Sequence, residues 1–273
     1  MRHRALLAAG GTTEWSPSLL SPFLWLDASV SASLTSSAGK VSRWDDVGPN
    51  GHFFGTATAG EKPTTNATTQ NGLNVVDFNS ANWLVHDAQA SGSYNNATTA
   101  AKFTALHDGT AYIIAMVSKL TNAGVNTAYI GNHQGNSNQR GFHLFHTSSG
   151  RFATYLQTGS GYNSPLSATP LDSSASPKIH VLRADPGNAT AANRSYIRQN
   201  GGAASQDNAQ TAAPSTSAPG LVTVLGGIPD SASSIGFGLW GWLAEMVIIT
   251  GANATDANAV LLRDYLNEKW AIY

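Results

Sequence analysis

The sequence predicts an all-β domain built as an antiparallel two-sheet sandwich. Short apolar runs recur between turn-forming residues, and no run is regularly followed by a helical pattern, which disfavours a parallel α/β sheet. The 41% of hydrophobic residues include 7 Trp, 9 Phe and 8 Tyr, enough large side chains for a substantial core. One core is the simplest organisation for 273 residues, because sandwiches of ~200 to 250 residues often form one unit.

The expected strands are rich in β-branched and aromatic residues. Run 111–119 is apolar on both alternating faces, which is typical of a central strand, whereas 151–157 alternates in a mixed way and indicates one partly solvated face. Residues 147–150 between two runs fit a hairpin loop. In chain order, the expected strands are 23–27, 40–44, 73–78, 111–119, 127–131, 142–147, 151–157, 178–183, 194–199, 221–226 and 239–250.

One helix is expected, at 256–269, near the end of the chain. Thr255 can cap its first turn, and Leu262, Leu266 and Trp270 form an apolar stripe at spacings of four residues. The helix should therefore lie against the sandwich, which spans 23–273.

The first 22 residues are expected to form an arm that precedes the sandwich. The arm carries two basic and two apolar side chains that are candidate anchors to a partner or a second subunit: Arg2, Arg4, Leu6 and Leu7. The alternative is a flexible tail, because chain ends are usually disordered unless something holds them.

Composition argues against several partners. Only 11% of residues are charged and the net charge is −1, so we expect no electrostatic attraction to nucleic acid or to an anionic membrane. The sequence has no Cys, which excludes disulfides and thiolate metal sites. No window approaches the ~18 apolar residues of a membrane span, and the apolar run at 5–9 is too short for a secretory signal.

Acidic residues do not form a recognisable catalytic pattern. Glycosidases need paired carboxyls, ~5 Å apart in retaining enzymes. Glu245 is the glutamate that falls in an expected strand, and its neighbours two residues away, Leu243 and Val247, are apolar. We therefore expect Glu245 to be buried or at an edge, hydrogen-bonded near the helix, and the chain not to be an enzyme.

Other motifs have plain structural interpretations. The G-x-G-x-x-G string at 236–241 precedes a strand instead of opening a helix, so it does not indicate a dinucleotide site. His143 and His146 should point to opposite faces of a strand. Residues 46–51 indicate a tight turn; an EF-hand would need an acid where Ala57 stands. No cofactor or metal is expected, with a loop calcium left open.

Several segments, in order, resemble the concanavalin A-like lectin/glucanase (laminin G-like) domains of bacteriophage virion proteins and bacterial surface proteins. The resemblance covers roughly 23–273 and implies a jelly-roll sandwich, with Trp25 and Trp44 expected to face inward. The segments are 24–29 (LWLDAS), 39–46 (GKVSRWDD), 48–52 (GPNGH), 62–63 (KP), 71–78 (NGLNVVDF) and 241–249 (GWLAEMVII), followed by the helix to 269–272.

The resemblance does not imply a single activity, because the fold hosts lectins, hydrolases and structural modules. Together with the absence of a signal peptide, the absence of Cys and the low charge, it favours a non-enzymatic structural or decoration protein on a bacteriophage particle. We expect the sandwich to be displayed from the capsid or tail, to contact other virion proteins or further copies of itself, and to aid adsorption to the host. The alternative is a carbohydrate-binding module that recognises a host surface glycan through loop aromatics such as Tyr94 and Tyr162. Ordinary loop anchoring is the competing interpretation of both tyrosines, and a glycoside hydrolase is the third function considered.

Overall fold

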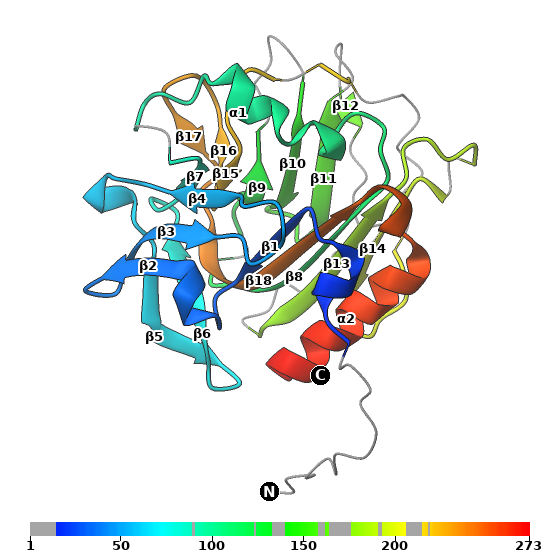
Figure 1. The fold of residues 1–273 in the computed structure, drawn as a ribbon, viewed down its shortest axis with the longest axis horizontal. Coiled ribbons are helices and arrows are strands. Elements are labelled where there is room, and N and C mark those ends of the chain that lie inside the picture. Colours follow the sequence, from blue (N-terminus) through cyan, green and yellow to red (C-terminus); the bar gives the residue numbers. More distant parts are fainter. Residues whose placement is uncertain are drawn as a thin grey trace, which may run out of the picture.

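The computed structural model describes residues 15–88, 91–122, 124–132, 140–157, 162–163, 176–190, 193–205, 215–217 and 219–273. The candidate anchors Arg2, Arg4, Leu6 and Leu7 lie outside these residues. The chain forms an antiparallel β-sandwich with one long helix near its end, as the sequence predicts (Figure 1). The helices are α1 (Ala97–Ala101) and α2 (Asp256–Trp270).

The strands follow one another in the order β1 (Leu24–Asp27), β2 (Leu34–Ser37), β3 (Lys40–Asp45), β4 (Phe53–Gly55), β5 (Thr64–Gln70), β6 (Leu73–Asn79), β7 (Leu84–His86), β8 (Tyr112–Leu120), β9 (Thr127–Gly131), β10 (Phe142–His146), β11 (Phe152–Gln157), β12 (Tyr162–Asn163), β13 (Lys178–Ala184), β14 (Ser195–Gln199), β15 (Val224–Leu225), β16 (Ile228–Pro229), β17 (Ile235–Gly236) and β18 (Trp240–Thr250).

Hydrogen bonds join most strands into one continuous path that folds over on itself. The path runs β12-β11-β10-β9-β15-β7-β4-β3-β5-β6-β18-β8-β13-β14, with β1 beside β18 and β2 beside β3. The inner core lies where its two ends face each other. Met116 and Leu182 from one side meet Phe142 and Leu144 from the other in one buried cluster.

A second apolar layer covers the outer face of β8, β13 and β18. On β8, Ile114 belongs to the inner core, whereas Ile113 and Ala115 belong to an outer cluster with Leu262 and Leu266 of α2. Strand β8 pairs with β18 on one side and β13 on the other, so the predicted central strand is confirmed. The result is three layers, with α2 lying across the sheet (Figure 1).

Helix α2 begins and packs as its sequence predicts. The hydroxyl of Thr255 accepts a hydrogen bond from the backbone N–H of Asn258 at 3.2 Å, which satisfies one of the free donors at the helix start. The predicted stripe of Leu262, Leu266 and Trp270 is fully buried. The helix ends where Ala271 turns into the left-handed region, at φ 50°.

The segment just before the sandwich is packed onto it. The rings of Trp15 and Tyr265 lie 5.8 Å apart, edge to face. Leu20 is 8% exposed, and its carbonyl accepts a hydrogen bond from Asn253 at 3.0 Å. Residues 15–22, the end of the expected arm, therefore contact the outer layer, α2 and the turn that precedes this helix.

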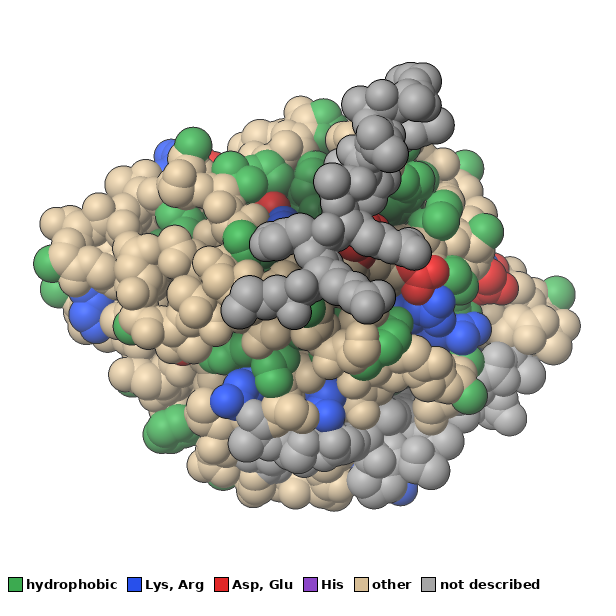
Figure 2. All heavy atoms as spheres, turned by 90° about the horizontal axis from the view of Figure 1, so that it is seen from below, with side chains coloured by type: hydrophobic (Ala, Val, Ile, Leu, Met, Phe, Trp, Pro, Cys, Tyr) green, Lys and Arg blue, Asp and Glu red, His purple; other side chains and the backbone are tan. Residues whose placement is uncertain are grey.

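The surface reflects the low charge of the sequence. On the face shown in Figure 2, charged side chains appear as scattered spots among uncharged polar and apolar groups. Within the described part of the chain, no helix is long and apolar enough to cross a membrane.

Candidate functional site

A pair of carboxylates does exist, although the sequence showed Glu245 without a partner. Strands β1 and β18 pair so that Asp27 lies directly opposite Glu245. A register shift next to Leu243 puts that residue in the inner core while Glu245 faces α2, so the expected same-face relation of these two was wrong. The pair is sealed under the helix, with Asp27 2% and Glu245 0% exposed.

Four donors converge on the Glu245 carboxylate. Trp25 Nε1 and Trp270 Nε1 each donate over 2.7 Å, Lys269 Nζ over 2.8 Å and the Tyr265 hydroxyl over 3.1 Å. Burial raises the pKa of Glu245, and nearby Asp27 raises it further, while Lys269 and the Trp270 indole oppose this change. The expectation of a buried, hydrogen-bonded Glu245 near the helix is confirmed.

This acid pair fastens the helix and has no room for a substrate. Lys269 binds both Asp27 and Glu245. Trp25 faces this outer layer, because its strand neighbours Leu24 and Leu26 occupy the inner core. The expectation that Trp25 faces inward is therefore corrected, whereas Trp44 is fully buried in the inner core as expected.

Of the two tyrosines considered as sugar contacts, Tyr94 is buried. Tyr94 is 1% exposed and packs with Val85, Val222 and Val224. Its backbone donates to Ala232 and accepts from Val222, which holds the loop inward. Tyr94 is therefore a loop anchor, and its expected role as an exposed platform was wrong. Tyr162 belongs to β12, but its side chain lies outside the described part of the structure.

Two further sequence interpretations are confirmed. The Asp46 carboxylate accepts hydrogen bonds from the backbone of Trp25 and of Gly48, each at 2.8 Å, as a turn cap does. On β10, Leu144 belongs to the inner core and Phe145 to an outer cluster, so His143 and His146 point to opposite faces, and they are 8% and 2% exposed. Among the described residues, no three His, Cys, Asp or Glu side chains gather in a way that could hold a metal.

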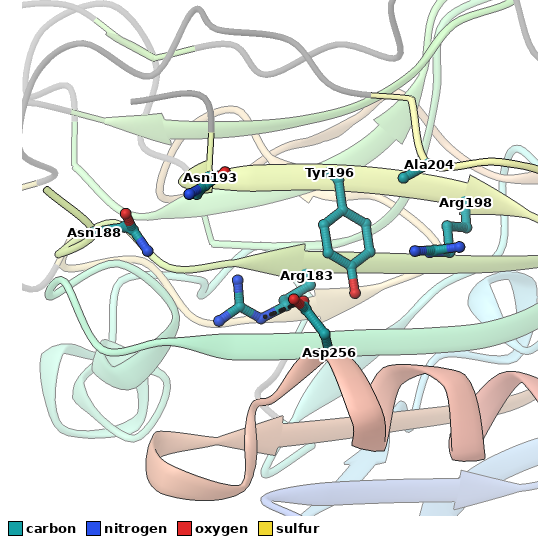
Figure 3. A pocket seen from close by; sticks show the side chains of 7 residues that line it. All are labelled: Arg183, Asn188, Asn193, Tyr196, Arg198, Ala204 and Asp256. Carbon is teal, nitrogen blue, oxygen red and sulfur yellow. Dashed lines mark ion pairs between the residues drawn. The ribbon is translucent and has the colours of Figure 1, made fainter. Parts of the chain in front are cut away.

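A polar pocket of about 280 Å³ opens beside the start of α2, on the outer face of the β13–β14 edge (Figure 3). On a strand, alternate side chains share one face. Ile179, Val181 and Arg183 therefore share the outer face of β13, and Arg183 lies opposite Tyr196 of β14. The polar residues that line the pocket are Arg183, Asn188, Asn193, Tyr196, Arg198 and Asp256.

Arg183 is held rigidly as one wall of this pocket. Its Nε donates to the carbonyl of Ala254 at 3.1 Å and pairs with Asp256 Oδ1 at 3.2 Å. Its Nη2 reaches Asp185 Oδ2 at 3.3 Å. Two carboxylates thus balance one guanidinium, which joins β13 to the first residue of α2.

Arg198 has a donor that no described residue uses, and it lies beside Tyr196. The Arg198 guanidinium lies 5.1 Å above the Tyr196 ring, a geometry in which cation and ring attract each other. Within the described part of the chain, Arg198 Nε is shielded from solvent without a hydrogen bond, whereas the Tyr196 hydroxyl lies beside the Asp256 carboxylate. Burial raises the pKa of Tyr196 to about 12, and Asp256 adds to the increase, so its hydroxyl is a donor at neutral pH.

The pocket is suited to binding. Both of its nearby acids, Asp185 and Asp256, are paired with the same guanidinium. The side chain of Asn188 donates to Asp185 at 3.2 Å and accepts from the backbone of Thr190 at 3.0 Å, so it too is fixed. A preformed set of donors around two arginines can hold an oxygen-rich ligand.

Comparisons with known proteins give weak structural likenesses. No family model matches the chain, and no curated protein matches it. It is similar to the Ruminococcus gnavus IT-sialidase CBM40, with a TM-score of 0.48 and 16% identity over 64% of this chain and 94% of that one. The same module bound to alpha2,3 sialyllactose gives 0.45 and 18%, covering 62% and 91%.

Whole sialidases give similar values. The Streptococcus pneumoniae NanB sialidase reaches a TM-score of 0.44 at 16% identity, over 63% of this chain and only 27% of that one. At such identities and TM-scores, these likenesses support no conclusion about function. Function therefore rests on the pocket.

The sequence-based prediction placed the ligand contacts on aromatic residues of loops. It therefore missed this pocket, whose arginines lie on strands. A usable signal was present in run 178–183, where Arg183 continues the apolar face of Ile179 and Val181. A charged residue on the buried face of a strand requires a partner or a function.

Proposed function

We propose that this chain is a carbohydrate-binding module that holds one unit of an anionic glycan in the pocket beside α2. The observation that carries the proposal is the Arg198 guanidinium lying over Tyr196, with a shielded Nε that has no hydrogen bond to any described residue. A sugar carboxylate can accept from the planar Arg198 guanidinium beside the Tyr196 ring.

The mixed polarity of the pocket favours a sugar over a bare phosphate group. Asp256 is 72% exposed at the rim and can accept hydrogen bonds from sugar hydroxyls. Its charge, with that of Asp185, would repel a multiply charged phosphate. Amide groups of Asn188 and Asn193 add donors and acceptors that match a polyhydroxylated ring. The pocket volume lies near the lower end of small-molecule sites, ~300 to 1,000 Å³, which suits one sugar unit.

The test is calorimetric titration of the chain with sialyllactose, with a glucuronate-terminated disaccharide and with lactose as the uncharged control. We expect an acidic sugar to bind and lactose to bind at least 10-fold more weakly. Arg198→Gln should lower the affinity more than 10-fold, because a hydrogen bond to a charged group contributes about 1.5 to 3 kcal/mol. The matched control is Arg43→Gln, an arginine that is 45% exposed on β3.

Arg43→Gln should leave the affinity unchanged. The proposal fails if neither acidic sugar binds, or if Arg198→Gln binds them as the unchanged chain does. Circular dichroism on each variant separates a lost contact from a lost fold.

Display on a bacteriophage particle is a second proposal, supported by the order of the sequence segments from 24–29 to 241–249. Mass spectrometry of purified particles tests it. The informative truncation removes residues 1–14, because Trp15 and Leu20 pack on the sandwich and their loss would disturb the fold. Loss of the truncated chain from particles that contain the full chain would support an anchoring arm. If the full chain is absent from purified particles, display on a bacteriophage particle is refuted, and the carbohydrate-binding proposal is unaffected.

A further inference from the structure

Residues 236–240 expose two aromatic side chains where the chain enters β18. Phe237 is 48% exposed and Trp240 is 38% exposed, whereas Leu239 between them is fully buried. The backbone of this segment crosses the start of β9. Both rings are therefore presented from one short, anchored segment.

Phe237 has a backbone conformation that its side chain does not favour. Its φ is 51°, in the left-handed region. Ten non-glycine residues of the described chain have positive φ, and the other nine are Ser, Ala, Asn or Asp, residues that tolerate this region better than a bulky ring. Because about half of the Phe237 ring is exposed, its burial does little to offset the cost of the strained backbone. Such strain is typical of functional positions.

Hydrogen bonds and close packing hold this segment rigid. The Ala128 N–H donates to the Phe237 carbonyl at 2.7 Å. The Thr127 hydroxyl donates to the Gly238 carbonyl at 3.0 Å and lies 3.1 Å from the Trp240 N–H. A Cβ on Gly238 would lie 2.0 Å from the carbonyl oxygen of Ser80, so only glycine fits there.

The surroundings of the rings are polar. The Asp230 carboxylate lies against Gly236, where an added Cβ would be 2.4 Å from both carboxylate oxygens. Burial raises the pKa of Asp230. In the adjoining turn, the exposed hydroxyls of Ser231 and Ser234 are 2.8 Å apart. Gly236 immediately precedes Phe237, so this carboxylate and these hydroxyls lie beside the Phe237 end of the segment, where they match a polyhydroxylated ligand better than an apolar protein surface.

This surface is remote from the pocket. Gly241, at the start of β18, pairs with Leu120 of β8, whereas Arg183 of the pocket pairs with Ile113 of the same strand. Seven residues of a strand span about 23 Å. The two surfaces therefore act independently.

We propose that Phe237 and Trp240 form a second saccharide-binding surface, which takes neutral pyranose rings. The apolar C–H face of a pyranose covers an aromatic ring favourably, because it buries apolar area and meets the electron-rich face of the ring. Asp230 accepts hydrogen bonds from sugar hydroxyls at the edge. Phe237 and Trp240 are separated by at most ~10 Å along the backbone, so short oligosaccharides are long enough to test both positions.

The test is affinity electrophoresis of the full chain in gels that contain a soluble β-glucan, a mannan or a galactan. At least one polysaccharide should retard the chain. Phe237→Asn, which suits the left-handed region, and Trp240→Ala should each reduce that retardation at least 10-fold. Leu19→Ala is the matched control, because Leu19 is 56% exposed on the segment that precedes β1.

Arg198→Gln should be retarded like the unchanged chain, which separates this surface from the pocket. Phe237→Asn should keep the thermal midpoint of the unchanged chain or raise it. The proposal is overturned if no neutral polysaccharide retards the chain, if both aromatic variants are retarded normally, or if Phe237→Asn lowers the thermal midpoint, since the ring would then be a packing residue.

Discussion

Replacing Glu245 with glutamine should be among the most damaging conservative substitutions in this chain. Two donors reach each carboxylate oxygen: Trp25 and Tyr265 reach Oε1 at 2.7 and 3.1 Å, and Lys269 and Trp270 reach Oε2 at 2.8 and 2.7 Å. Glutamine keeps one oxygen but turns an NH₂ group toward the other two donors. Either orientation of the amide sets donor against donor.

The magnitude follows from the contacts that are lost. Two hydrogen bonds to a charged acceptor contribute about 1.5 to 3 kcal/mol each. Breaking a buried ion pair by removing one partner costs about 3 to 5 kcal/mol. Asp27 continues to pair with Lys269, which compensates part of the charge. We therefore expect Glu245→Gln to lower the free energy of unfolding by about 3 to 5 kcal/mol, a large part of the ~5 to 15 kcal/mol of a typical domain.

Urea unfolding at pH 7, followed by tryptophan fluorescence, measures this loss. The midpoint should fall while the slope with urea stays constant. Glu268→Gln on the same helix is the matched control, because Glu268 is exposed, and its effect should stay within ~0.5 kcal/mol. If Glu245→Gln behaves like Glu268→Gln, the four-donor network contributes nothing and the reasoning is refuted.

Two further predictions concern the free energy of unfolding, first at low pH and then after substitution of a closely packed glycine. Burial lowers the pKa values of three histidines from the usual 6.5 to about 4, about 4 and about 3: His86, His146 and His180. Above pH 6.5 the three histidines are neutral in both the native and the unfolded chain, and stability is at its full value. Between pH 6.5 and about 4, the unfolded chain binds protons that the native chain does not, so the free energy of unfolding falls. Urea unfolding should therefore show losses approaching ~1.4 kcal/mol per pH unit for each histidine below pH 6.5; constant stability from pH 7 to 5 would contradict this. Gly241→Ala should destabilise by about 2 to 4 kcal/mol, because φ is 147° and a Cβ would lie 1.9 Å from the Lys119 carbonyl oxygen. Gly60→Ala, with open space around it, is the unfolding control.

The long apolar strands and α2 could be predicted because their signals are local. Run 111–119 shows both apolar faces within one window, and Thr255 with its stripe defines the helix. Strand β5, in contrast, reads TTNATTQ and has no apolar alternation. Its place is fixed by pairing with β6, where Thr65 lies opposite Val76. A sequence window does not contain that partner.

The sites were harder to predict because they depend on register between distant segments. Asp27 meets Glu245 only because β1 pairs with β18 at that register. Arg183 meets Asp256 only because α2 begins above the end of β13. Tyr94 illustrates the opposite error, since a loop position suggested exposure while backbone bonds to Val222 and Ala232 hold it inside.

The stabilising network and the proposed binding pocket lie at opposite ends of α2. The buried network at Glu245 and Lys269 holds the end of the helix, whereas Arg183 and Asp256 hold its beginning beside the pocket. A 15-residue helix separates these ends by about 22 Å. Asp256 is 72% exposed, so its ion pair adds little to stability while still shaping the pocket rim. Substitutions at Glu245 should therefore change the folded fraction, and substitutions at Arg198 should change the affinity of the folded chain.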